Sequence, residues 1–206
     1  MSRPIPSSTL EAAVRAHFGL TQEELGRYLG VSERQVGNLE AGRRVASAAL
    51  ILRLERLVHL LPPPLGAGVA APIFEELVLP EAPAAAMLAE ALPPFEALAA
   101  APLRVRQRQV SAQITKLREV LHRESRRASV LARRQWGLAG LQAALLGARV
   151  DAVERAHIAR WLRTLATDVA AATPNPVALA ERALIVARLL ALEVEAAAVV
   201  RLLAAG

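Results

Sequence analysis

The sequence predicts an all-α protein. Apolar residues make up 54% of its 206 residues and aromatic residues only 3%. Much of the apolar content is alanine, which favours closely packed helices over stacked sheets. Apolar residues recur at spacings of three and four, as on one face of a helix, and no segment shows a convincing strand pattern. We therefore expect an N-terminal helix-turn-helix, a proline-rich linker and an antiparallel bundle of longer helices.

The first helices are marked by signals for their N-termini. The stretches "STLE" (8–11), "TQEE" (21–24) and "SERQ" (32–35) each fit a capping box, in which the side chains at the two ends bond each other's backbone amides. Gly30 lies between the second and third helices, where a sharp turn favours a residue that can adopt a positive φ. Two helices joined by such a turn form a helix-turn-helix, although the spacing alone also fits any small helical hairpin. The apolar seam between these two helices is predicted from Leu25, Leu29, Val31, Val36 and Leu39.

A proline-rich stretch divides the chain. The sequence "LPPPLGAGVAAP" (61–72) contains four prolines and two glycines, which break helices. We predict a helix-turn-helix domain over residues 1–61, a Pro/Gly-rich linker over 62–80 and a helical bundle over 81–206. Within the bundle, Asn175 and Pro176 suit the cap and first turn of the last helix. The bundle helices are expected from Leu103 to about Leu146, from Asp151 to Ala172 and from Pro176 to the C-terminus.

The longest predicted helix carries an interrupted heptad pattern. Apolar residues recur at sevens, but Glu124 and Gln135 occupy core-type positions. These interruptions favour an antiparallel bundle over a long two-stranded coiled coil. Gly137 and Gly140 are expected to bend or end the helix. The heptad positions are Leu103, Val110, Leu117, Leu131, Leu138 and Leu145.

The charge of the chain is unevenly distributed. Its net charge is +6, but residues 104–136 hold nine Arg and one Lys against two Glu, a net charge of +8. Residues 62–103 hold five Glu and no basic residue, a net charge of −5. A basic segment of this kind can follow a phosphate backbone or pair with acidic residues. We expect the two segments to neutralise each other, because the arginines recur along a helix and do not form a tail.

The composition also indicates the cellular compartment of the protein. Cysteine is absent, which excludes disulfides and thiolate zinc sites and suits a reducing compartment. The N-terminus lacks the apolar core of a secretory signal. The most apolar stretch, 183–205, is interrupted by four charged residues and does not predict a membrane span. We expect a cytoplasmic protein with no membrane partner.

No pattern predicts an enzyme. Two Glu-x-x-His pairs, Glu119–His122 and Glu154–His157, have the spacing that di-metal helical bundles use. Helical geometry turns Glu119 and His122 away from the apolar face of their helix, and Glu154 follows Asp151 at the spacing of a capping box. We therefore expect no metal site, no cofactor, no catalytic residue and no enzymatic activity.

Two stretches of the N-terminal part carry a more specific signal. They read "LTQEELGRYLGVS" (20–32) and "VGNLEAGRR" (36–44). Both resemble the Cro/phage-repressor (XRE-like) helix-turn-helix family: the first its second helix and turn, the second the end of its third helix. The resemblance covers residues 8–61. Gly26, Gly37 and Ala46 depart from residues common in the family, and each glycine costs about 1 kcal/mol of helix propensity relative to alanine.

The resemblance implies which residues contact DNA. Residues 32–41 would form a recognition helix whose N-terminal side chains lie at base edges in the major groove. Arginine can pair with guanine, glutamine and asparagine with adenine, and glutamate with cytosine. The implied base contacts are Ser32, Glu33, Arg34, Gln35 and Asn38, and the implied phosphate contacts are Gln22, Arg43 and Arg44.

Several of these residues also have a purely structural interpretation. Glu33 suits the first turn of a helix because it complements the helix dipole. Gln35 can be used by its capping box. Arg34 and Asn38 have no core or capping role, so a DNA contact is favoured for both. Tyr28 is interpreted as a packing residue and not as a phosphate contact.

These observations predict a sequence-specific transcription regulator of double-stranded DNA. We expect a repressor that binds a two-fold operator as a homodimer, with the helical bundle supplying the dimer interface. The alternative is an interaction protein, either an antitoxin or an assembly adaptor, in which residues 81–206 bind a protein partner and DNA binding is secondary.

Overall fold

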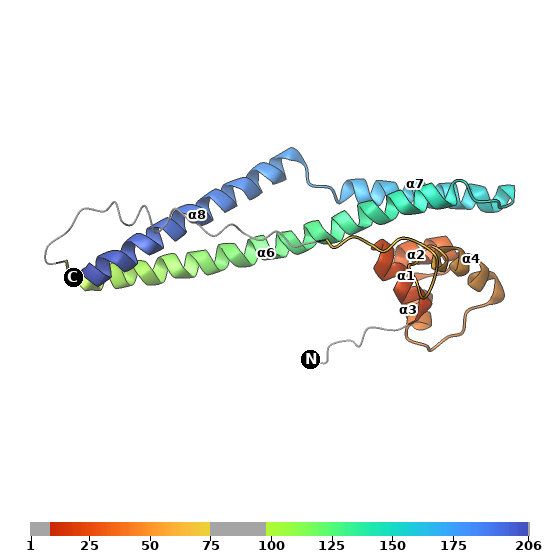
Figure 1. Ribbon diagram of the computed structural model, residues 1–206, viewed down its shortest axis with the longest axis horizontal. Helices are drawn as coiled ribbons and strands as arrows, with labels where there is room; N and C mark the ends of the chain where they lie inside the picture. Colours follow the sequence, from red (N-terminus) through yellow and green to blue (C-terminus); the bar gives the residue numbers. More distant parts are fainter. Residues whose placement is uncertain (1–8, 75–97, 206) are drawn as a thin grey trace. The chain divides into compact units, whose positions relative to one another are not determined.

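The computed structural model describes residues 9–74 and 98–205 (Figure 1). These two ranges contain seven helices and no strand, which confirms the all-α prediction. The chain separates into two compact units, residues 1–75 with 129–173 and residues 76–128 with 174–206. Helix α6 (Ala100–Leu145) contributes to both units. The predicted domain boundaries at residues 61 and 80 stay predictions.

The first unit begins with four short helices. Both predicted capping boxes that open α2 and α3 are confirmed. The first helix is capped by Thr9, whose Oγ1 accepts a hydrogen bond from the Ala12 amide at 3.4 Å, and Ser8 of the predicted box lies outside the described residues. Gly30 ends α2 at φ 76°, as the predicted turn requires. The four helices are α1 (Leu10–Phe18), α2 (Gln22–Leu29), α3 (Glu33–Glu40) and α4 (Ala48–Val58).

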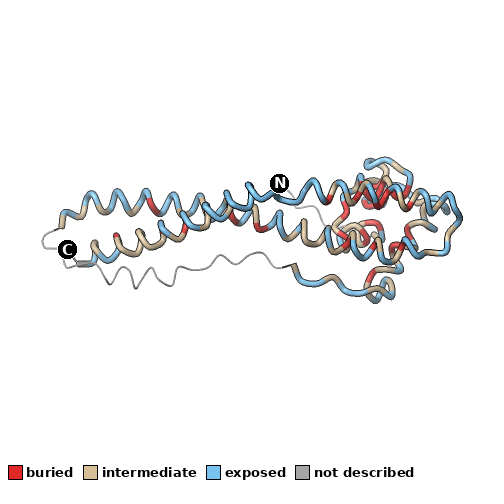
Figure 2. The backbone as a smooth tube through the Cα atoms, turned by 90° about the horizontal axis from the view of Figure 1, so that it is seen from above, coloured by how far each residue is buried: buried red, intermediate tan, exposed pale blue. Residues whose placement is uncertain are grey.

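The core of the first unit extends beyond these four helices. Helix α7 (Ala152–Ala171) and the end of α6 add apolar residues to the same cluster. Trp161 of α7 lies against Tyr28 of α2, with ring centroids 4.6 Å apart. Figure 2 shows the buried positions concentrated in this unit. The shared cluster includes Val14, Leu25, Tyr28, Val36, Leu57, Leu141, Ile158, Trp161 and Leu165.

The part of the predicted linker that the structure describes folds back on α4. Residues 62–74 contain no helix, as the prolines predict. The amides of Ala67 and Gly68 donate to the carbonyls of His59 and Leu61, at 3.0 Å and 2.8 Å. The described portion of this segment is therefore attached to the end of α4.

The long helix does not end at Gly137 or Gly140, and a bend at these glycines stays a prediction. Helix α6 continues to Leu145, and both glycines lie inside it. A Cβ at Gly137 would overlap the carbonyl oxygen of Phe18 at the end of α1, whereas a Cβ at Gly140 would meet nothing within 4 Å. Gly137 is therefore a packing residue that lets α1 approach the backbone of α6.

The second unit pairs α6, up to residue 128, with α8 (Pro176–Ala205). Arg106 near the start of α6 bonds Glu195 at 2.5 Å, while Glu124 lies 3.9 Å from Arg182 near the start of α8. The two helices are therefore antiparallel. Asn175 caps α8 through the Ala178 amide at 2.8 Å, with Pro176 in its first turn, as predicted. The residues buried in this unit include Val110, Leu121, Leu189, Leu192 and Val199.

The expected pairing of the basic segment with the glutamates of residues 62–103 stays a prediction. The five glutamates of residues 62–103 lie outside the described residues. Within the second unit, Arg106 and Arg118 pair with Glu195 and Glu193 of α8. Among residues 9–74 and 98–205, no helix combines the length and apolar composition that crossing a membrane requires.

Candidate nucleic-acid interface

The outward face of α3 carries most of the predicted base contacts. Helix α3 buries Val36, Leu39 and Glu40. Arg34 lies on the opposite face and is exposed, and Asn38, one turn later, is half-buried. Neither side chain has a hydrogen bond or ion pair within the described part of the chain. Both are therefore free to bond a base edge.

The N-terminus of α3 uses two of the predicted contacts for its own capping. The Ser32 Oγ accepts from the Gln35 amide at 3.3 Å, and Gln35 Oε1 accepts from the Ser32 amide at 2.9 Å. Gln35 Oε1 also accepts from the Ser32 hydroxyl at 3.3 Å. Bidentate pairing with adenine needs both the oxygen and the nitrogen of a glutamine. In this arrangement Gln35 can offer a base only its Nε2 donors, in line with the capping role that its sequence pattern indicated.

Glu40 holds the first three helices together. Its carboxylate accepts two hydrogen bonds from Arg15, from Nε at 2.7 Å and from Nη2 at 3.1 Å. Gln22 Nε2 donates to the same carboxylate at 2.7 Å. The Glu40 side chain is 7% exposed. These bonds orient α3 against α2, and they leave Gln22 with one side-chain N–H for a phosphate.

The chain that leaves α3 presents exposed cations. Gly42 adopts φ 67°, and the Arg43 amide donates to the Asn38 carbonyl at 2.9 Å. Arg43 and Arg44 are exposed and make no side-chain bond to another described residue. Glu33, the remaining predicted contact, is also exposed. Exposed, unpaired cations of this kind suit the binding of phosphates.

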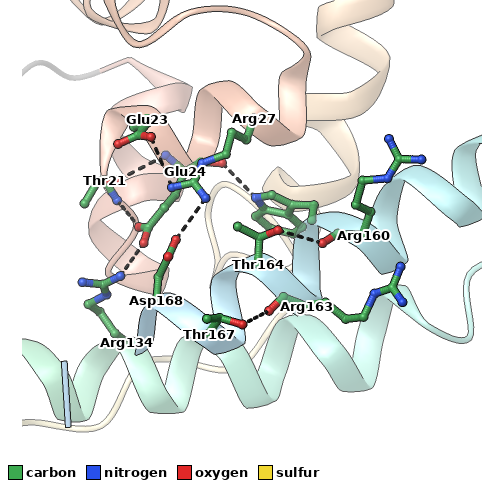
Figure 3. A network of polar contacts seen from close by, with 11 residues as sticks. Thr21, Glu23, Glu24, Arg27, Arg134, Arg160, Arg163, Thr164, Thr167 and Asp168 are labelled. Carbon is green, nitrogen blue, oxygen red and sulfur yellow. Dashed lines mark hydrogen bonds and ion pairs between the residues drawn. The ribbon is translucent and has the colours of Figure 1, made fainter. Parts of the chain in front are cut away.

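A network of polar contacts connects α2 to α6 and α7 (Figure 3). Glu24 Oε2 accepts from the Thr21 amide at 2.7 Å, and Glu24 Oε1 pairs with Arg134 of α6. The Glu24 carbonyl accepts from Trp161 Nε1 of α7 at 2.8 Å. Arg27 bonds Asp168 of α7 at 3.0 Å. Helix α2 is therefore fixed by partners that lie more than a hundred positions later in the chain.

The burial of Tyr28 confirms that it is a packing residue. It is fully buried, and its hydroxyl donates to the Arg53 carbonyl at 3.2 Å. Burial raises the pKa of the Tyr28 phenol, against the opposing charge of nearby Arg56. His157 Nε2 donates to the Tyr28 carbonyl at 2.7 Å. The phenol is thus occupied inside the unit and faces no ligand.

The second Glu-x-x-His pair has structural roles. Glu154 accepts from Arg53 Nη2 at 2.8 Å and from Arg56 Nη1 at 2.6 Å, both on α4. Its amide is capped by Asp151 at 2.8 Å, so only half of the predicted capping box is present. His157 is used by the Tyr28 carbonyl. In the part of the chain that the structure describes, no cluster of three or more potential ligands could hold a metal ion.

The comparisons with known proteins agree with this geometry. Residues 12–60 match the family described as helix-turn-helix. This match confirms the predicted Cro/phage-repressor (XRE-like) segment, the DNA-binding domain of a transcription regulator. No curated protein and no solved structure matches the chain. The match does not reach α6 or α7, whose packing onto this segment is seen in the structure.

Proposed function

We propose that this protein is a sequence-specific repressor that binds a two-fold operator as a homodimer. Helix α3 enters the major groove, with Arg34 and Asn38 at base edges. Ser32, Glu33 and the Nε2 group of Gln35 lie at the same end of the helix and complete the contact. Gln22, Arg43 and Arg44 bind the flanking phosphates.

The observation that carries this proposal is the combination of unpaired and hydrogen-bonded side chains on α3 and on the chain that follows it. Arg34, Arg43 and Arg44 are exposed and unpaired among the described residues, while the buried Glu40 is fully bonded behind them. An exposed unpaired arginine adds nothing to folding, but it can bond guanine O6 and N7. The rigid support behind the helix favours a fixed register on the duplex.

Selection from random DNA duplexes tests the proposal. The full chain is expected to enrich an inverted repeat whose half-sites are about one helical turn apart, 10–10.5 base pairs between their centres. An Arg34→Ala variant, selected in parallel, should lose preference at one base pair of each half-site. Failure of the full chain to enrich any motif would contradict sequence-specific binding. Enrichment of a single half-site would contradict the two-fold operator.

A further inference from the structure

Helix α8 is apolar on more faces than one neighbour can cover. Leu189, Leu192 and Val199 are buried on the side that faces α6. Val177 and Leu184 are 65% and 70% exposed. A helix that is apolar all round is normally covered on all sides. Within the described residues of this unit, α6 is its only helical neighbour.

The exposed apolar residues of α8 form one stripe. Val177, Ala180, Leu184, Ala187 and Ala191 are all exposed and recur at alternating spacings of three and four. This is the spacing of a seam between two helices. The two large side chains alternate with alanines, so large and small residues can interdigitate across a close contact. The stripe therefore fits a second helix of similar composition.

Two opposite charges lie beside the stripe, one before Leu184 and one after it. Glu181 lies three residues before Leu184 and Arg188 four residues after it, and both side chains are exposed. Neither has a hydrogen bond or ion pair among the residues that the structure describes. Seven residues separate them, which is two helical turns, so they lie on the same side of α8. The same side of the helix thus offers one acid before Leu184 and one base after it.

We propose that this stripe, Val177–Ala191, pairs with the same stripe of a second copy of the chain in antiparallel orientation. With the two-fold axis at Leu184, Val177 packs against Ala191 of the second copy. Glu181 then lies opposite Ala187 of the second copy, one position from its Arg188, and Arg188 lies opposite Ala180, one position from its Glu181, so both charge pairs are within reach of long side chains. A two-fold contact repeats each interaction, so one complementary pair in the sequence supplies two ion pairs at the interface.

Sedimentation of the full chain, without DNA, tests the pairing. The wild-type chain is expected to dimerise. Glu181→Arg and Arg188→Glu each place like charges together twice and should weaken dimerisation about tenfold or less, the range for exposed pairs. The double variant Glu181→Arg/Arg188→Glu restores opposite charges and should dimerise within about threefold of wild type. Circular dichroism checks that each variant keeps its helical content.

A second pair of variants tests the apolar seam. Leu184→Lys is expected to make the full chain monomeric, because it buries a charge at the two-fold axis. Leu52→Lys is the matched control, since Leu52 is a leucine of α4 that is 62% exposed in the other unit. It should leave the dimer intact. Dissociation by Leu52→Lys with no effect of Leu184→Lys would overturn the proposed surface.

The remaining outcomes separate this inference from the proposed function, on which it rests only for the two-fold operator. A chain that stays monomeric at all concentrations overturns the inference, and so does a double variant that dimerises no better than the single variants. Dimerisation through α8 without enrichment of any DNA motif would instead contradict the proposed function and leave the interface standing.

Discussion

Glu24 of α2 and Arg134 of α6 form an ion pair across 110 positions of the chain, and it ties the first turn of α2 to a distant helix. One oxygen of the same carboxylate closes the capping box with the Thr21 amide, while the other meets the guanidinium. The side chains are only 4% and 18% exposed. A local helix signal and a tertiary contact therefore depend on one buried carboxylate.

Removal of Arg134 should leave that carboxylate buried without its counter-charge. Breaking a buried pair from one side is strongly destabilising, so Arg134→Met is expected to lower the free energy of unfolding by about 3 kcal/mol. Arg163→Met, at an exposed arginine of α7, should change it by less than about 0.5 kcal/mol. Urea denaturation of both variants measures the difference. Equal effects would show that the pair contributes nothing specific.

The Glu154 carboxyl makes stability depend on pH. Burial alone raises its pKa, but the hydrogen bonds and charges of Arg53 and Arg56 outweigh burial, and its pKa lies below the ordinary 4.5. A depressed carboxyl pKa adds stability above the unfolded-state pKa, and this stability is lost as pH falls through the folded-state pKa. Glu154→Gln should therefore lower the free energy of unfolding at neutral pH. Its difference from the wild-type protein should shrink below about pH 4.5. Thermal denaturation over a range of pH measures this difference in stability, with Glu55→Gln, at an exposed glutamate of α4, as control. A difference that does not change with pH would contradict the lowered pKa of Glu154.

Two arginines of the candidate interface should contribute differently, one to sequence specificity and the other to general affinity for DNA. Arg34→Ala is expected to lose about 1–3 kcal/mol on the preferred operator and to relax preference at one base pair. Arg43→Ala should weaken all sequences alike and lower the salt slope by about one. Titrations on operator and scrambled duplexes at several salt concentrations measure both effects. If each variant changes only nonspecific affinity, α3 is not the recognition helix.

Two glycines of α6 should respond in opposite ways to the same substitution. Gly137→Ala forces a Cβ into the Phe18 carbonyl, and overpacking of this kind destabilises by about 1–3 kcal/mol. Gly140→Ala enters open space and should stabilise by up to about 1 kcal/mol, because alanine favours the helix. Thermal melting of the two variants gives the sign directly. Stabilisation by both would mean that α1 does not approach α6 this closely.

The predicted site residues divide according to the range of their interactions. Ser32 and Gln35 could be assigned to a capping box because both bonds lie within four consecutive residues. The engagement of Gln22 by Glu40 spans 18 positions and has no local signature. The exposure of Arg34 followed from the helical period, since Val36 and Leu39 define the buried side. The free side chains were thus easier to predict than the bonds that support them.

Capping, turn chemistry and apolar period act over a few residues, so the starts of α2 and α3 and a helix-turn-helix within residues 8–61 could be predicted from the sequence. Which apolar faces meet could not be predicted in this way and is seen in the packing of the helices. Ile158, Trp161 and Leu165 recur at spacings of three and four along α7, but this spacing does not show that their face covers Tyr28 of α2. Hydrophobic burial has no direction, so an apolar face can be covered by any other. Partners that lie far apart in the sequence, such as Glu24 with Arg134, make this arrangement specific.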